Sequence, residues 1–172
     1  MQIALVSADQ SESLVDLLCE LHAFYNDPTT ATRESVQEHL LQNLLGIHSP
    51  VRLIVATHPE RGVVGFAAIV LLYSLVDPKP ESRRQCQVKE LFVRSSARSQ
   101  GVGRALMAWV ARYALEQGCG RIDWNVKVSN SEGIFFYESL GAQNVIDRLS
   151  YRLSKTSMVQ LANQSDGGQV DG

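Results

Sequence analysis

Six residues in the middle of the chain, Arg-Ser-Gln-Gly-Val-Gly at positions 98–103, have the types and spacing of an anion-binding loop. They separate an apolar run at residues 88–93, expected to be a strand, from an amphipathic run at residues 102–117, expected to be a helix. The first N–H groups of a helix have no acceptor within it, and glycine lets a phosphate approach them closely. The guanidinium groups of Arg98 and Arg104 would attract the same anion. The loop is a candidate cradle for a pyrophosphate, and the alternative is a simple glycine-rich turn.

Neither of two common nucleotide-binding motifs fits this loop. A dinucleotide fingerprint needs a third glycine three residues after Gly103, where the chain has Leu106, and no acidic ribose-binding residue follows at the expected point. A Walker A loop ends in Gly-Lys-Ser/Thr, whereas this chain continues with Arg104 and Ala105. These differences argue against a Rossmann site and against a nucleoside triphosphate site.

The pattern Arg-x-x-Gly-x-Gly, which follows Leu91-Phe92-Val93, resembles the acyl-CoA-binding motif of the GCN5-related N-acetyltransferase (GNAT) superfamily. A second block at residues 130–142, Asn-Ser-Glu-Gly-Ile-Phe-Phe-Tyr-Glu-Ser-Leu-Gly-Ala, is similar to that family's Asn-x-x-(small)-x-x-Phe-Tyr-x-x-x-Gly block and comes at the expected point. The resemblance covers roughly residues 2–153. Within the family, residues 115–119 and 123–124 look like the diamine and thialysine N-acetyltransferase subgroup.

The resemblance implies that acetyl-CoA is the acyl donor substrate. No metal is expected, because the four histidines are scattered with no cysteine or carboxylate cluster around them. Backbone groups at the end of the strand would pair with the pantetheine amides, and the glycine loop would hold the pyrophosphate. Asn130 is implied to contact the pantetheine arm, and it could also cap the helix that follows. The expected cofactor-binding residues are Leu91, Phe92, Val93, Arg98, Ser99, Gln100, Gly101, Val102, Gly103, Arg104, Asn130 and Tyr137.

Acetyl transfer from a thioester to an amine needs a base for the ammonium and a proton for the leaving thiolate. By its place in the family block Tyr137 is the general acid, and a phenol pKa of about 10 lies near a thiol pKa of about 8.5. The alternative makes Tyr137 only a core residue of its helix. Glu90 is the nearest carboxylate for the base, although the subgroup's glutamate aligns with Lys89. Neighbours on a strand face opposite ways, so Glu90 can serve only if a bulge re-aims it. Otherwise Glu90 has a structural or substrate-orienting role.

The acyl acceptor is expected to be a primary amine on a small aliphatic amine, polyamine or amino acid. Residues 21–25 with Asp27, and residues 73–81, lie where members of the family build the acceptor pocket. Other possible acceptors are a protein N-terminus, a lysine or an aminoglycoside. From a different class, the chain could be a catalytically silent acyl-CoA-binding regulatory module. Lys89 argues mildly for that alternative, and retention of Tyr137 argues against it.

The composition is that of an ordinary soluble globular domain. The chain has 172 residues, 45% of them hydrophobic, and a formal net charge of -2, which gives no general attraction to nucleic acid or to an anionic membrane. Three widely spaced cysteines and four scattered histidines form no metal-binding or disulfide pattern. With no secretion signal or membrane-spanning run, the protein is expected to be cytoplasmic. As in many relatives, a homodimer is expected.

Periodicity and the resemblance together predict an α/β fold of the α+β type, with a GNAT-like acyl-CoA N-acyltransferase architecture. The resemblance implies a central mixed sheet, flanked by helices and splayed between its fourth and fifth strands, with the pantetheine arm in the gap. Residues 1–154 are expected to form this domain and residues 155–172 a polar, disordered tail. Strands are expected at residues 2–7, 51–57, 63–75, 88–93, 121–128 and 145–153.

Overall fold

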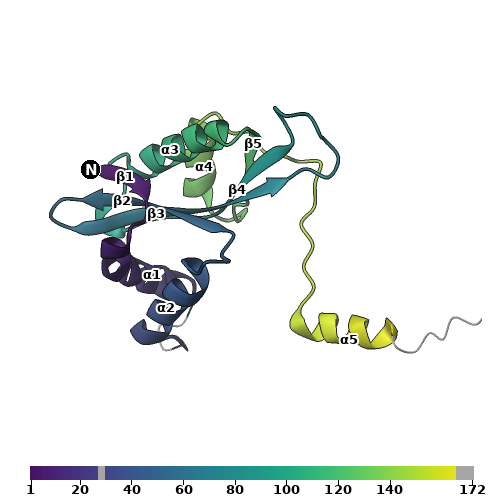
Figure 1. The fold of residues 1–172 in the computed structure, drawn as a ribbon, viewed down its shortest axis with the longest axis horizontal. Coiled ribbons are helices and arrows are strands. Elements are labelled where there is room, and N and C mark those ends of the chain that lie inside the picture. The colour runs from purple at the N-terminus through teal and green to yellow at the C-terminus, as the bar shows by residue number, and fades with distance from the viewer. Residues whose placement is uncertain (27–29, 166–172) are drawn as a thin grey trace, which may run out of the picture. The chain divides into compact units, whose positions relative to one another are not determined.

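The computed structural model describes residues 1–26 and 30–165 and divides the chain into two compact units, Met1–Asn130 and Ser131–Gly172. The first unit is a five-stranded mixed sheet with helices on both faces (Figure 1), which confirms the predicted fold class. Its strands lie side by side in chain order, all antiparallel except the last pair, β4 and β5. The strands are β1 (Gln2–Leu5), β2 (Val51–His58), β3 (Gly62–Tyr73), β4 (Arg84–Val93) and β5 (Cys119–Asp123).

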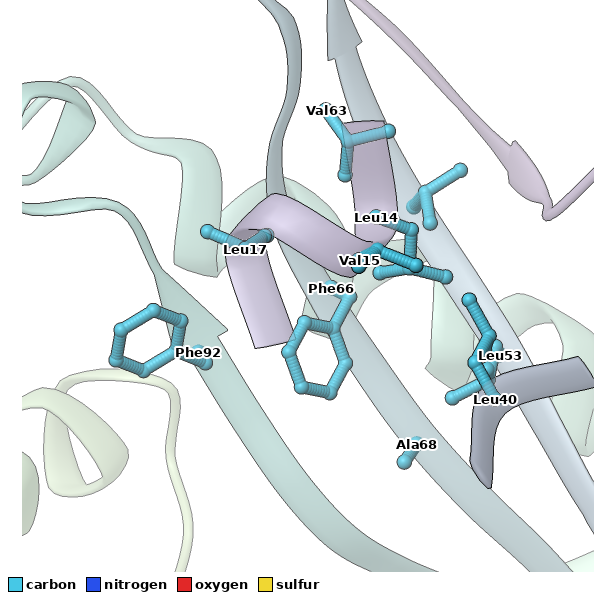
Figure 2. Close-up of a cluster of buried hydrophobic side chains, with 10 residues drawn as sticks. Leu14, Val15, Leu17, Leu40, Leu53, Val63, Phe66, Ala68 and Phe92 are labelled. Carbon is cyan, nitrogen blue, oxygen red and sulfur yellow. The ribbon is translucent and has the colours of Figure 1, made fainter. Parts of the chain in front are cut away.

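One face of the sheet is covered by α1 (Ser11–Tyr25) and α2 (Arg33–His39), which continues into a short π-helical turn, Leu40–Leu44. The apolar side chains of α1 recur at helical spacing, so one stripe of the helix faces the strands. Phe66 of β3 and Phe92 of β4 meet this stripe, with ring centroids 6.4 Å apart (Figure 2). The buried cluster is Leu14, Val15, Leu17, Leu40, Leu53, Val55, Val63, Phe66, Ala68 and Phe92.

The other face is covered by α3 (Val102–Glu116), which connects β4 to β5. A crossover of this kind is what allows two strands of a sheet to run parallel. The helix packs closely on β3 at Gly65, where an added Cβ would lie 3.2 Å from Val102 Cγ1 and 3.3 Å from Leu106 Cδ1. Gly65 thus sets how near the start of α3 comes to the sheet.

β4 and β5 pair over only part of their length. Their register runs from Arg84 opposite Cys119 to Gln87 opposite Asp123. Among the described residues, the rest of β4 has no partner in β5, whereas it stays paired with β3 up to Val93. This divergence is the predicted splay, and it leaves one backbone edge at the end of β4 outside the sheet's hydrogen-bond ladder.

The second unit contains α4 (Ser131–Ser139) and α5 (Lys155–Ser165). The prediction that residues 145–153 form a strand and close the sheet is wrong, because these residues have no regular secondary structure. Their apolar content favours an extended conformation, but a strand also needs a partner for its backbone groups. None of the five described strands pairs with them.

Residues 155–165, which the composition assigned to a disordered tail, are described as helix α5. This segment is helical, and Ser154 caps it, since the N–H of Ser157 donates to Ser154 Oγ at 3.2 Å. Met158, Gln160, Leu161 and Ala162 are good helix formers, and they outweigh the polar composition that motivated the expectation. Residues 166–172 lie outside the described part of the chain.

Candidate active site

The glycine loop has the conformation of an anion-binding helix entrance. A short turn, Ser95–Ala97, follows β4, and the chain then takes positive φ values at Ser99 (59°) and Gly101 (79°) before α3 begins at Val102. The first backbone bond at the start of α3 runs from the N–H of Ala105 to the carbonyl of Gly101, at 3.0 Å. In helix geometry, N–H groups of the first turn such as those of Val102 and Gly103 have no acceptor within the helix. Unpaired N–H groups at a helix start are the groups that a phosphate site uses.

Two side chains tie the loop to the backbone before it. Gln100 Nε2 donates to the carbonyl of Ser96 at 3.0 Å, and Arg98 Nε donates to the carbonyl of Val93 at 3.0 Å. The Arg98 guanidinium lies 5.9 Å from the ring centroid of Phe24 and 5.8 Å from that of Phe92. Arg98 therefore contacts the strand end and two aromatic rings, whereas the sequence was interpreted as placing its charge at the pyrophosphate.

The end of β4 carries the residues expected to meet the pantetheine arm. Leu91, Phe92 and Val93 pair with β3 on one edge, and their other edge lies beyond the paired part of β5. On that strand the Val93 carbonyl already accepts from Arg98. An extended ligand that pairs with the end of β4 would therefore have to share or displace this contact.

A β-bulge in β4 determines where Glu90 lies. Ala68 is opposite Glu90 and Ile69 is opposite Val88, so Lys89 is an extra residue with no partner in β3. In a regular strand Val88 and Glu90 would lie on the same face of the sheet. The bulge places Glu90 on the face of Ala68 and Val88 on the opposite face, that of Ile69. Ala68 belongs to the cluster packed against α1. The structure thus contains the bulge that the assignment of Glu90 as base requires.

Glu90 is partly buried and hydrogen-bonded at this position. The Tyr25 hydroxyl, at the end of α1, donates to Glu90 Oε1 at 3.4 Å. Burial raises the pKa of the Glu90 carboxyl above its ordinary value, and hydrogen bonds from the Leu91 N–H and from Tyr25 offset part of this rise. Burial, and then the neighbouring Glu90 charge, raise the pKa of Tyr25. The raised pKa of Tyr25 keeps its phenol protonated, so that the hydroxyl can act as the donor to Glu90.

Phe24 lies beside Tyr25, and both rings are exposed. Phe24 and Tyr25 meet edge to face at 5.1 Å, and 62% and 48% of their surfaces are exposed. The ammonium of Lys127 lies 5.2 Å from the centroid of the Tyr25 ring. Residues 21–25 were expected to border the acceptor, but no sequence pattern indicated Lys127. Three residues far apart in the chain, from α1, β4 and the segment after β5, meet only in the folded unit.

The other expected site residues lie in the segment after β5, on α4 and at the end of β3. Asn130 ends the first unit, and its N–H donates to the carbonyl of Lys127 at 2.9 Å. Tyr137 lies on α4 in the second unit, with its ring 5.1 Å from that of Phe136. Tyr73, at the end of β3, is 67% exposed and holds the Arg84 guanidinium 5.1 Å from its ring centroid. Asp27 lies outside the described residues.

A cavity of about 380 Å³ lies between α1 and α2, and it includes neither Glu90 nor the glycine loop. Its charged lining is already paired, since Arg33 bridges Asp16 at 3.1 Å and Glu12 at 2.7 Å. Within residues 1–26 and 30–165, no group of three or more His, Cys, Asp and Glu side chains is placed to hold a metal ion. In the same part of the chain, no helix has both the length and the apolarity to cross a membrane.

The chain is similar in sequence to characterised acetyltransferases. L-Ornithine N5-acetyltransferase NATA1 of Arabidopsis thaliana is 39% identical over 56 residues, which cover 33% of this chain and 25% of that protein. Thialysine N-epsilon-acetyltransferase of Mus musculus is 30% identical over 110 residues, which cover 59% of each. The chain therefore spans less than two thirds of these curated relatives.

A solved structure is similar over nearly its whole length. This is the integron cassette protein VCH_CASS6 from the mobile metagenome of V. cholerae, which is 30% identical with a TM-score of 0.84, covering 94% of this chain and 96% of that one. The family model described as Acetyltransferase (GNAT) family matches residues 18–142, a range that contains the bulged strand, the glycine loop and α4. The splayed sheet, the loop at the start of α3 and these matches agree, and the chain belongs to the acetyltransferase (GNAT) family.

Proposed function

We propose that this protein transfers an acetyl group from acetyl-CoA to the primary amine of a small aliphatic amine, polyamine or amino acid. The family match supports acetyl transfer from acetyl-CoA, and the named activities of the ornithine and thialysine relatives support a small amine as acceptor. The observation that carries the proposal is the bulge at Lys89, which turns a partly buried carboxylate toward the exposed aromatic rings at the end of α1. A silent binding module would have no need of this arrangement.

In the proposed reaction, Glu90 is the base. The acceptor arrives as an ammonium with a pKa near 10.4, and its nitrogen is nucleophilic only after losing a proton. A carboxylate with a raised pKa takes that proton at a lower cost than an ordinary one. Burial raises the pKa of Glu90 in this direction.

The amine nitrogen then attacks the thioester carbonyl carbon directly, and the carbon–sulfur bond breaks. Tyr137 donates its hydroxyl proton to the leaving thiolate and regains one from solvent, while the new amide nitrogen and Glu90 each release one proton to solvent. Acetyl-CoA and the ammonium thus yield an N-acetyl amine, CoA and one proton. The loop from Arg98 to Arg104, the end of β4 and Asn130 would bind the CoA, and no metal is needed.

The direct test measures thiol release from acetyl-CoA with a panel of diamines, amino acids, aminoglycosides and peptides. We expect turnover with small primary amines and at most slow turnover with peptides and aminoglycosides. Binding of acetyl-CoA without turnover on any amine would instead identify a silent acyl-CoA-binding module.

We also propose that the protein acts in the cytoplasm as a homodimer. Three cysteines without a disulfide, of which Cys86 and Cys119 are buried, are compatible with a reducing compartment. Fractionation of the native host, with the protein followed by antibody, tests the location.

A further inference from the structure

The ring of Tyr25 connects a carboxylate to a cation. Its hydroxyl donates to Glu90 Oε1 at 3.4 Å, and the Lys127 ammonium lies 5.2 Å from its centroid. A cation within about 6 Å of an aromatic centroid is attracted by the negative face of the ring. Lys127 itself is exposed and lies in the irregular segment between β5 and α4. Its ammonium is therefore held beside the proposed base by a ring contact and can be approached by a solute.

Within residues 1–26 and 30–165, Glu90 is the carboxylate that acts on Tyr25. Arg98 places a second cation against Phe24, the neighbour of Tyr25. Arg94, which follows β4, is paired with Glu20 of α1 at 3.0 Å. Glu90 is thus the carboxylate that the Tyr25 ring contacts, with two cations, Lys127 and Arg98, on the adjoining aromatic faces. A site that binds an acceptor with several positive charges is expected to have more carboxylates than cations around it.

We propose that Lys127 is a specificity-determining residue, whose ammonium on the Tyr25 ring favours acceptors that carry a carboxylate away from the reacting amine and disfavours those that carry a second ammonium. This inference rests on the proposed function, because it takes Glu90 as the group that meets the reacting amine. The remote end of the acceptor then meets the field of Lys127. A carboxylate at that end is attracted to Lys127, an uncharged end is neither attracted nor repelled, and a second ammonium is repelled.

A matched series of acceptors isolates this effect. The compounds 5-aminopentanoate, pentylamine and 1,5-diaminopentane share a five-carbon chain and a terminal amine but differ in the charge of the remote end. The wild-type protein should show kcat/KM values that fall in that order. In Lys127→Met, the ratio of 5-aminopentanoate to 1,5-diaminopentane should fall by about three- to tenfold, the size of a single charge interaction near a protein surface. Lys127→Arg should keep the wild-type ratio, since it keeps the charge and the ring contact.

The control is Arg61→Met, which removes one exposed positive charge from the turn between β2 and β3. It should leave the ratio unchanged, and it separates a local effect of Lys127 from a change in net charge. In wild type, raising the salt concentration should compress the ratio, whereas in Lys127→Met salt should have little further effect. A ratio that is the same in Lys127→Met and wild type overturns the inference even if turnover is high.

Equilibrium binding distinguishes a failure of the proposed charge selection by Lys127 from a failure of the proposed function. Calorimetry of the three compounds with the CoA-loaded protein should show affinities in the same order, and Lys127→Met should reduce the spread. If wild type acetylates none of the three but their affinities keep the order and respond to Lys127→Met, the proposed reaction fails and the charge selection stands. If none of the three compounds binds, or if their affinities are the same in wild type and Lys127→Met, the charge selection is wrong.

Discussion

At the scale of single residues, chemistry depends on which face of β4 a carboxylate occupies. Lys89 stands where the related subgroup is expected to have its glutamate, and the acid is displaced by one position. The bulge compensates for this displacement by turning Glu90 to the face of Ala68, where Tyr25 donates to it. In the proposed mechanism, a shift of one residue in register thus offsets a shift of one residue in sequence.

Glu90→Gln tests whether this carboxylate is the base. Turnover should fall, and the acidic limb of the kcat/KM profile that reports deprotonation of Glu90 should disappear. If the profile of Glu90→Gln keeps that limb, another group is the base.

The same variant has a consequence for stability. Because folding raises the pKa of Glu90, the folded state favours its protonated form, and this contribution is lost as the pH rises through the folded pKa. Glu90→Gln should therefore melt about 1–3 °C above wild type at neutral pH, a small shift because the side chain is only partly buried. The two melting curves should converge below the ordinary pKa of 4.5, where the carboxyl is protonated in both states. A wild-type protein that instead melts above Glu90→Gln at neutral pH, with the gap closing toward acid pH, would mean that folding lowers the pKa of Glu90.

Tyr137→Phe tests the general acid. The change removes the hydroxyl and keeps the ring, so folding and CoA binding should survive while kcat falls by about 10²- to 10⁴-fold. Stopped-flow measurement of thiol release, with circular dichroism to verify the fold, gives the comparison. Full kcat in a folded Tyr137→Phe protein would remove this residue from the mechanism.

At the scale of elements, the two glycines of the loop have different tasks. Gly101 precedes α3 with φ at 79°, a conformation that other residues adopt only at a cost, although an added Cβ would meet no atom within 4 Å. Gly103 lies in the first turn of α3, and among the described residues it is not one of the glycines with positive φ. The backbone conformation thus favours glycine at position 101, whereas the backbone at Gly103 does not require it.

Substitutions at the two positions should therefore separate stability from binding. Gly101→Ala should lower the free energy of unfolding by about 1 kcal/mol. Gly103→Val should keep most of the stability but lose affinity for CoA by at least tenfold, because its side chain stands where a phosphate must come close. Denaturant unfolding and calorimetry measure the two quantities. Unchanged CoA affinity in folded Gly103→Val would exclude this loop as the pyrophosphate site.

At the scale of the whole molecule, the second unit has apolar side chains that its own residues do not cover. Within Ser131–Gly172, Ile146 is 87% exposed and Tyr151 is 88% exposed, in a segment without regular secondary structure. Apolar groups gathered in one exposed segment usually mark an interaction surface. This exposure is consistent with the proposed homodimer.

Light scattering tests that proposal directly. The wild-type chain should have the mass of a dimer at micromolar concentration, and Ile146→Asp should shift it toward the monomer because burying a carboxylate at an interface is costly. Arg61→Asp, a change on the β2–β3 turn, should leave the mass unchanged. A wild-type protein that stays monomeric across micromolar concentrations would contradict the homodimer and leave the catalytic proposal intact.

Local patterns were sufficient to determine most of the fold and part of the site. The alternation in β2 and β3, the helical spacing in α1 and α3, and the glycines before α3 are properties of neighbouring residues, so the sequence predicts them directly. The same holds for the two motifs around Gly103 and Tyr137, whose residues lie close together in the chain. The expected strand at residues 145–153 failed because a strand depends on a partner as well as on its own composition.

What only the tertiary structure decided concerns residues that are distant in the chain. The sequence required a bulge for Glu90 to serve as a base, but the register between β3 and β4 places it at Lys89. The contacts of Tyr25 with Glu90 and Lys127 depend on how α1 and the segment after β5 lie against the sheet. The partial burial that raises the pKa of Glu90 has the same origin. Such contacts arise from packing between elements, which no local spacing of residues encodes.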